Sequence, residues 1–194
     1  ASYISTTSRG FLPTPGVASM LVEIAPGMQV NRLLDTSLKA SASRPSILVV
    51  ERAFGLMEFH HEDKGQVQLG GQAVLDSLSL EETGRIKPRI ISNEIIRSIE
   101  PYHAQLINRI RYGDMILPGQ SLFILETEPA GYVAFAANEA EKAANIALVE
   151  ARLFGAFGRL YLSGTEAEID SAAEAALNAI NSIDGIENPK NKKK

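Results

Sequence analysis

The sequence predicts an α+β protein built as a tandem duplication, and three observations lead to this fold class. The 194-residue chain matches itself when it is shifted by 103 residues. Short apolar runs entered from Pro-Gly turns alternate with segments of helical periodicity. These segments follow the same order in both halves. A chain of this length buries roughly 70% of its unfolded surface, so it needs no disulfide or metal to fold.

The internal repeat is ungapped over about the first forty positions and defines two copies of one unit. Its glycines and prolines coincide at places typical of turns. The match then resumes at an offset of 100, and the last helices align at 102, with Ala73/Ala175 and Leu75/Leu177. The identical pairs at an offset of 103 are Ala1/Ala104, Ile4/Ile107, Gly10/Gly113, Pro15/Pro118, Gly16/Gly119, Glu23/Glu126, Pro26/Pro129, Val30/Val133, Lys39/Lys142 and Ala40/Ala143. The identical pairs at an offset of 100 are Leu48/Leu148, Val49/Val149, Arg52/Arg152, Phe54/Phe154 and Gly55/Gly155.

Each repeat is predicted to run strand, helix, strand, strand, helix. The strands are apolar runs bounded by Pro-Gly or Phe-Gly turns. The first helix carries Val30, Leu33, Leu34 and Leu38 on one face. The last helix begins at a capping box of Thr165 and Glu168. In chain order, first repeat then second, the elements are strands 20–24 and 122–126, helices 29–41 and 132–144, strands 47–50 and 146–149, strands 56–60 and 157–162, and helices 66–78 and 166–183.

Residues 86–103 form a strand-forming segment with no partner in the first repeat. By the offset, its partner would precede Ala1, so we expect the natural protein to have further N-terminal residues that include a strand. The predicted domains are residues 1–85, residues 86–187 and a basic tail, 188–194. Helices packed on an open sheet give each domain an α+β sandwich.

Composition excludes several classes of protein. Without cysteine there is no disulfide framework, thiolate zinc site, iron–sulfur cluster or cysteine nucleophile, which fits the cytosol. The net charge is −4, and −8 once the four lysines of the tail are set aside, so the acidic body argues against nucleic-acid binding. No apolar run reaches the ~20 residues of a membrane span, and no signal peptide is evident. The lysine tail is interpreted as a solvated end.

Motifs for catalysis or metal binding are weak. His60 and His61 are adjacent on a predicted strand and point to opposite faces, so one chain cannot chelate a metal with both. A ring of one histidine from each of three chains stays possible but unsupported. Gly155-x-x-Gly158 echoes an RNA-clamping loop but lacks its helices and basic surroundings. No catalytic triad, phosphate loop or dinucleotide fingerprint is present. We therefore expect no enzyme activity, no cofactor and no metal.

Seven short motifs are distributed over both repeats. They are Arg9-Gly-Phe-Leu-Pro13, Asp35-Thr-Ser-Leu-Lys-Ala40, Val50-Glu-Arg-Ala-Phe-Gly55, Leu106-Ile-Asn-Arg109, Glu126-Thr-Glu-Pro-Ala-Gly131, Ala137-Asn-Glu-Ala-Glu-Lys-Ala143 and Gly155-Ala-Phe-Gly-Arg159. These motifs resemble the bacterial microcompartment shell domain in its circularly permuted form, and the tandem-domain shell proteins of carboxysomes in particular. The resemblance covers nearly the whole chain except the lysine tail.

The resemblance implies a structural protein of the carboxysome shell, in the bacterial cytoplasm. Three chains of two domains each would form a homotrimer with a hexamer-like outline, which tiles with other shell hexamers and pentamers. Two trimers would stack face to face, around a gated central pore. The phosphorylated metabolites ribulose bisphosphate and 3-phosphoglycerate would cross that pore. No nucleic acid or membrane partner is implied.

By this resemblance, Glu51 and Arg52 match the pore-gating pair. Beside a three-fold axis each would occur three times around one opening, whereas on residue type alone they read as an ordinary exposed pair at a strand end. The resemblance also implies that Lys39 and Lys142 contact neighbouring tiles at the tile edge. The alternative is that both are ordinary solvated lysines on helices. Residue 151 is Ala where the first repeat has Glu51, so the second loop would shape the pore rather than gate it. The pore-lining residues would be Phe54, Gly55, Arg152, Phe154 and Gly155.

Two other functions stay open from the residues. One is a soluble tandem α+β sensor that binds a small anionic effector between its repeats. The other, weaker, is an enzyme that uses Glu51, Arg52 or the histidines. The size of the particle in solution separates the shell protein from the sensor, because a shell tile is a trimer or a stack of trimers and the sensor a monomer.

Overall fold

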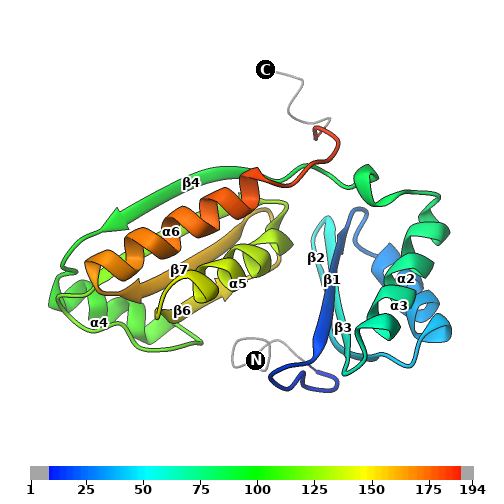
Figure 1. The fold of residues 1–194 in the computed structure, drawn as a ribbon, viewed down its shortest axis with the longest axis horizontal. Helices are drawn as coiled ribbons and strands as arrows, with labels where there is room; N and C mark the ends of the chain where they lie inside the picture. Colours follow the sequence, from blue (N-terminus) through cyan, green and yellow to red (C-terminus); the bar gives the residue numbers. More distant parts are fainter. Residues whose placement is uncertain (1–8, 189–194) are drawn as a thin grey trace. The chain divides into compact units, whose positions relative to one another are not determined.

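The computed structural model describes residues 9–188 and divides the chain into two compact units (Figure 1). The first unit comprises Ala1–Lys87 together with Asp184–Lys194, and the second comprises Pro88–Ile183. Residues 184–188 thus belong with the first unit, where Ile186 forms a parallel bridge with Ile86. The lysines of the basic tail, and any segment before residue 9, lie outside the described residues.

The first unit has a three-stranded antiparallel sheet with two helices on one face (Figure 1). The strand order is β1-β3-β2. Leu33 of the first helix packs with Met57 and Phe59 of the central strand in a fully buried core. The elements are β1 (Ala18–Ile24), α2 (Gln29–Ala40), β2 (Arg44–Glu51), β3 (Phe54–His61), α3 (Lys64–Leu78) and the short 3-10 helix η1 (Glu82–Gly84).

The second unit repeats this plan with one more strand and one more helix. Its antiparallel sheet has the order β4-β5-β7-β6, so the segment ahead of the second repeat does supply a strand. The α+β class predicted from the sequence is confirmed. No helix of the part of the chain that the structure describes is long and apolar enough to cross a membrane. The elements are β4 (Arg89–Ile96), α4 (Pro101–Ile110), β5 (Ser121–Glu128), η2 (Ala130–Tyr132), α5 (Val133–Ala143), β6 (Ala147–Arg152), β7 (Gly158–Gly164) and α6 (Glu166–Asn181).

The strand register corrects the sequence alignment of the two β-hairpins. Gly55 pairs with Ile24 and Gly158 pairs with Thr127, which keeps the offset at 103. The alignment at an offset of 100, which matched Arg52 with Arg152 and Gly55 with Gly155, is therefore wrong. A slip of three residues is odd, so it would turn every side chain of the strand to the other face of the sheet. In the fold, Arg52 corresponds to Gly155.

Helix α4 is not anticipated by the sequence pattern. Pro101 stands at its start, where proline is tolerated, and the Glu100 carboxylate accepts hydrogen bonds from the backbone N–H groups of Tyr102 and His103. Ala104 and Ile107 form its buried face and pack in one cluster with Leu122 of β5. The helix therefore adds a second small core to this unit.

Candidate functional site

The candidate site is the tip of the β2–β3 hairpin. Glu51 is the last residue of β2 and pairs with Phe54 across a two-residue turn, Arg52-Ala53. Glu51, Arg52 and Ala53 are all exposed. Within residues 9–188 neither the Glu51 carboxylate nor the Arg52 guanidinium has an ion-pair partner. The two charged groups are therefore free to pair with another molecule.

Arg52 has a backbone conformation that its side chain does not favour. Its φ angle is 52°, in the left-handed region, at the first central position of a two-residue turn. Turns of this kind strongly prefer glycine there. The corresponding residue of the second unit is Gly155, with φ 110°. The first hairpin therefore has an arginine at a position whose backbone conformation favours glycine, which strains the backbone. Backbone strain of this kind is concentrated at functional sites.

Replacing Arg52 by Gly is expected to raise the free energy of unfolding by about 1 kcal/mol, because glycine adopts a positive φ without steric cost. Urea unfolding at a fixed protein concentration measures the change. Arg52→Ala is the matched control, since it removes the same charge but keeps a Cβ at the strained position. Equal stabilities of the two variants would contradict the strain at residue 52.

Gly55 anchors this hairpin to the helix layer. A Cβ on Gly55 would lie 2.3 Å from the Gly27 carbonyl oxygen and 2.8 Å from Cβ of Val30 in α2. Gly158 has the same relation to the second unit, with a Cβ 2.2 Å from the Ala130 carbonyl oxygen. The two glycines let strand and helix backbones approach closely. Gly55 is buried and Phe54 is half-buried, so the exposed chemistry of the hairpin comes from Glu51 and Arg52.

The tip of the β6–β7 hairpin is chemically different. Arg152 is exposed at the end of β6, and its Nη2 lies 3.8 Å from Oε1 of Glu150 on the same strand. Burial raises the pKa of Glu150, whose other oxygen accepts a hydrogen bond from the Tyr112 N–H at 3.0 Å. Phe154 and Gly155 at the turn are half-buried and uncharged. Arg152 thus already has an ion-pair partner within its own unit, whereas Arg52 has none within residues 9–188.

The two lysines predicted at tile edges occupy the last turns of α2 and α5. Lys39 Nζ lies 2.6 Å from a carboxylate oxygen of Asp35, and Lys142 Nζ lies 2.7 Å from one of Glu139. The hydrogen bond from Lys142 lowers the pKa of Glu139. All four side chains keep solvent contact, so each lysine can exchange its helix partner for an acceptor on a neighbouring molecule.

A buried polar cluster on β3 was missed by the sequence analysis. The fully buried Glu58 carboxylate accepts hydrogen bonds from the hydroxyls of Ser19 and Ser46, and Nδ1 of His60 lies 3.3 Å from it. His61 instead accepts the backbone N–H of Asp63. The signal was present, because Glu58 and His60 share one strand face and Phe59 occupies the other. Within residues 9–188, no group of three or more acidic or histidine side chains could hold a metal ion.

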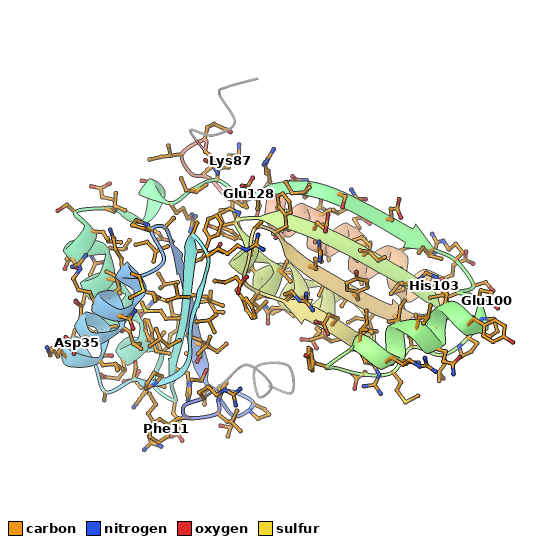
Figure 2. All side chains as sticks on the ribbon, turned by 180° about the vertical axis from the view of Figure 1, so that it is seen from behind. Phe11, Asp35, Lys87, Glu100, His103 and Glu128 are labelled. Carbon is orange, nitrogen blue, oxygen red and sulfur yellow. The ribbon has the colours of Figure 1, made fainter. Side chains whose placement is uncertain are left out.

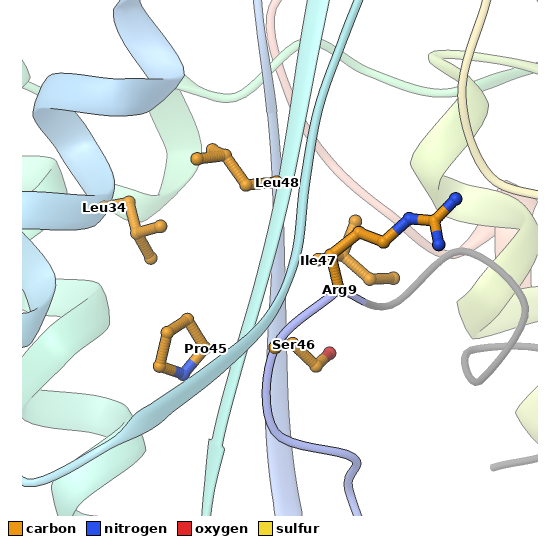
Figure 3. A pocket seen from close by; sticks show the side chains of 7 residues that line it. Arg9, Leu34, Pro45, Ser46, Ile47 and Leu48 are labelled. Carbon is orange, nitrogen blue, oxygen red and sulfur yellow. The ribbon is translucent and has the colours of Figure 1, made fainter.

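A small open pocket lies beside β2, between the segment at Arg9 and Leu34 of α2 (Figure 3). Its volume is about 210 Å³, and Pro45, Ile47 and Leu48 give it largely apolar walls. Sites for small molecules typically measure about 300–1,000 Å³ and hold several convergent polar groups. The exposed hairpin tip is therefore the stronger candidate.

Comparison with known proteins identifies the family. The family model described as the CsoS1D N-terminal domain matches residues 1–84. The carboxysome shell protein CcmP of Synechococcus elongatus is 49% identical over 97% of this chain and 89% of its own length. The carboxysome shell protein CsoS1D of Hydrogenovibrio crunogenus is 55% identical over 93% of this chain and 88% of its own length. The chain belongs to the CcmP and CsoS1D family of carboxysome shell proteins.

Solved structures of shell proteins have the same fold. The fused permuted hexameric shell protein MSM0275 of the RMM microcompartment superimposes with a TM-score of 0.92 at 45% identity, over 96% of this chain and 92% of that one. The double ringed trimeric shell protein MSM0271 of the same compartment gives 0.92 at 35% identity, over 97% and 94%. The tandem, circularly permuted shell-domain architecture predicted from the sequence is confirmed for this carboxysome shell protein.

Proposed function

We propose that three copies of this chain form a hexamer-like shell tile whose central pore is gated by Glu51 and Arg52. The observation that carries the proposal is the β2–β3 tip, where both charged groups are exposed and have no ion-pair partner within residues 9–188. Trimeric and hexameric relatives of the same fold support the assembly. The role is structural and transport, and no catalytic step is assigned to any residue.

Charge pairing between subunits supplies the gate. Around a three-fold axis, Glu51 of one subunit meets Arg52 of the next and the contact repeats three times. Each exposed pair contributes about 0.2–1 kcal/mol, so the ring is held by on the order of 1–3 kcal/mol. That is small enough for open and closed states to coexist and for a ligand to shift them.

The open state selects for anions. With the carboxylates turned aside, the three Arg52 side chains present a positive ring on an otherwise acidic protein. Phosphorylated metabolites such as ribulose bisphosphate and 3-phosphoglycerate are the molecules proposed to pass through the pore. Phe54 and Gly55 of the first hairpin shape the opening together with Arg152, Phe154 and Gly155 of the second. Lys39 and Lys142 contact backbone carbonyls of neighbouring tiles.

Replacing Glu51 and Arg52 together by Ala is expected to leave the trimer intact and lock the pore open. Glu51 and Arg52 are exposed, and neither forms an ion pair within the part of the chain that the structure describes, so the fold loses no core contact. Analytical ultracentrifugation reports the assembly, and electron cryo-microscopy reports the diameter of the opening. Uptake of 3-phosphoglycerate by purified shells is expected to rise.

The control changes an exposed acid–base pair away from the hairpin, Glu82 and Arg85, to Ala. This variant should keep wild-type assembly and wild-type uptake. Loss of the trimer in the Glu51/Arg52 variant would make the pair a structural contact rather than a gate. A wild-type protein that runs as a monomer would remove the shell-tile function altogether.

A further inference from the structure

Two arginines stand side by side on one face of the second sheet. Arg152 of β6 is directly opposite Arg159 of β7, which in turn is directly opposite Glu126 of β5, so the three side chains share a face. A Cβ on the preceding residue, Gly158, would lie 2.5 Å from a side chain of α5, so this face turns away from that helix. Figure 2 looks onto this side of the sheet, with Glu128 labelled at the end of β5. Like charges directly opposite each other destabilise a sheet, so the position of each arginine depends on an acidic partner.

The acidic partners of the two arginines differ. Nε of Arg159 lies 2.7 Å from Oε1 of Glu126, and this hydrogen bond lowers the pKa of Glu126. Nη2 of Arg152 lies 3.8 Å from Oε1 of Glu150, beyond hydrogen-bond distance, and burial raises the pKa of Glu150. The environments thus shift the two carboxyls in opposite directions. As the pH falls, Glu150 takes up a proton while Glu126 is still ionised.

The Glu150 carboxylate lies in largely apolar surroundings. The residue is 7% exposed, and Ile107 and Ile110 of α4 line the space beside it. Its Oε2 accepts a hydrogen bond from the Tyr112 N–H at 3.0 Å, whereas its Oε1 has no hydrogen-bond partner among the residues that the structure describes. Because Oε2 is already an acceptor, a proton taken up by Glu150 goes to Oε1, the oxygen on the side of Arg152.

The other titratable groups around Glu150 are uncharged or held elsewhere. Tyr161 stands directly opposite on β7, and its phenol is neutral at physiological pH. Arg111, just after α4, donates hydrogen bonds to a side chain of that helix and to a backbone carbonyl. Arg152 is therefore the charged group whose position depends on the ionisation of Glu150.

This arrangement belongs to the second unit. The fold does not depend on it, because the first unit forms the same hairpin with apolar side chains at the corresponding places. By the register of the strands, the residues that correspond to Glu150, Arg152 and Arg159 are Ile47, Val49 and Leu56.

We propose that Glu150 is a proton-dependent restraint on Arg152. When it is ionised, the carboxylate holds the Arg152 guanidinium beside β6. When Oε1 takes a proton from solvent, the ion pair is lost and repulsion from Arg159 turns Arg152 away from the sheet. The consequence for the pore rests on the function proposed above, which places Arg152 at the opening. Three chains would then present three released arginines there in acid, which favours the passage of anions.

The first test is the stability of Glu150→Gln, which keeps an oxygen for the Tyr112 N–H but cannot ionise. A carboxyl whose pKa is raised in the fold lowers stability as the pH rises from the ordinary pKa of glutamate through the raised value. In urea unfolding, Glu150→Gln should therefore be more stable than the wild type near neutral pH and lose this advantage in acid. A difference that does not change with pH would overturn the restraint.

Glu126→Gln is the matched control, because Glu126 also pairs with an arginine of this sheet but has a lowered pKa. The sign of its effect is reversed. This variant should be less stable than the wild type near neutral pH, and the loss should fade as the pH falls below the ordinary pKa of glutamate.

The second test locates Arg152 by electron cryo-microscopy of the full chain at about pH 8 and at about pH 5. The guanidinium should lie beside Glu150 at the higher pH and away from it at the lower, and in Glu150→Gln it should lie away from residue 150 at both. An unchanged position would overturn the restraint and leave the gate of Glu51 and Arg52 standing. A monomeric wild type whose Arg152 still moves with pH would keep the restraint and overturn the shell tile.

The third test measures uptake of inorganic sulfate, whose charge is constant over this range of pH, by purified shells. Wild-type uptake at low salt should rise about tenfold between the higher and the lower pH, and Glu150→Gln should give the high value at both. Glu126→Gln should keep the wild-type ratio. Movement of Arg152 without a change in sulfate uptake would overturn the control of the pore by Glu150.

Discussion

Gly55→Ala is expected to lower the free energy of unfolding by about 3 kcal/mol, and Gly158→Ala by a similar amount. The new methyl group would lie 2.3 Å from the Gly27 carbonyl oxygen in the first case and 2.2 Å from the Ala130 carbonyl oxygen in the second. Both obstacles are backbone atoms, which cannot rotate away, so the strand must move from its helix layer. Urea unfolding at a fixed protein concentration measures the loss.

Gly155→Ala separates this steric effect from backbone strain. Apart from its two chain neighbours, no residue of 9–188 has an atom within 4 Å of a Cβ on Gly155. Its φ is 110°, so the substitution costs only the strain of an L-residue there, about 1–2 kcal/mol. If Gly55→Ala lost no more than Gly155→Ala, close backbone packing would not be what holds the hairpin. A Gly55→Ala protein that still assembles should show a displaced Glu51-Arg52 tip, because the tip connects β2 directly to the start of β3.

The sequence was sufficient for most of the architecture, because the repeat and the helical periodicity are local signals. The capping box of Thr165 and Glu168 is confirmed, and so are the helices that follow the first strand of each repeat. Matching glycines in the two repeats also predicted the turns, although the match of Gly55 with Gly155 was wrong. The motif around Gly155 resembles that around Gly55, but the partner of a strand is set by pairing along the whole ladder and not by a short motif.

The remaining features depend on contacts between residues far apart in the chain. Ile186 pairs with Ile86, a hundred residues earlier in the chain, and a local sequence pattern cannot predict such a contact. Helix α4 has only ten residues, and its first three lie in the segment 86–103 that the sequence assigned to a strand. At the site, the exposure of Glu51 and Arg52 was expected, but the positive φ of Arg52 is visible only in the folded turn.

Glu58→Ala is expected to lower the free energy of unfolding by about 2–6 kcal/mol, because each of two hydroxyl donors that loses its buried acceptor costs about 1–3 kcal/mol. The carboxylate is fully buried and accepts from the hydroxyls of Ser19 and Ser46, which are left without their shared acceptor, and Nδ1 of His60 lies 3.3 Å from it. Glu58→Gln keeps the volume and one acceptor oxygen, so it should lose less. Chemical unfolding of the assembled protein gives the ranking, with Glu62→Ala, exposed just beyond the end of β3, as the unaffected control.

The cluster ties the three strands of the first sheet together at one point. Ser19 belongs to β1, Ser46 to β2, and Glu58 with His60 to β3, so a single carboxylate links all three strands through hydrogen bonds. The hairpin that carries the proposed gate is formed by β2 and β3, and a slip between these strands would displace its Glu51-Arg52 tip. Glu58→Gln trimers should therefore show a broader spread of pore diameters than the wild type at equal assembly. If the pore diameters of the variant were as uniform as those of the wild type, Glu58 would contribute to stability but not to the position of the hairpin tip.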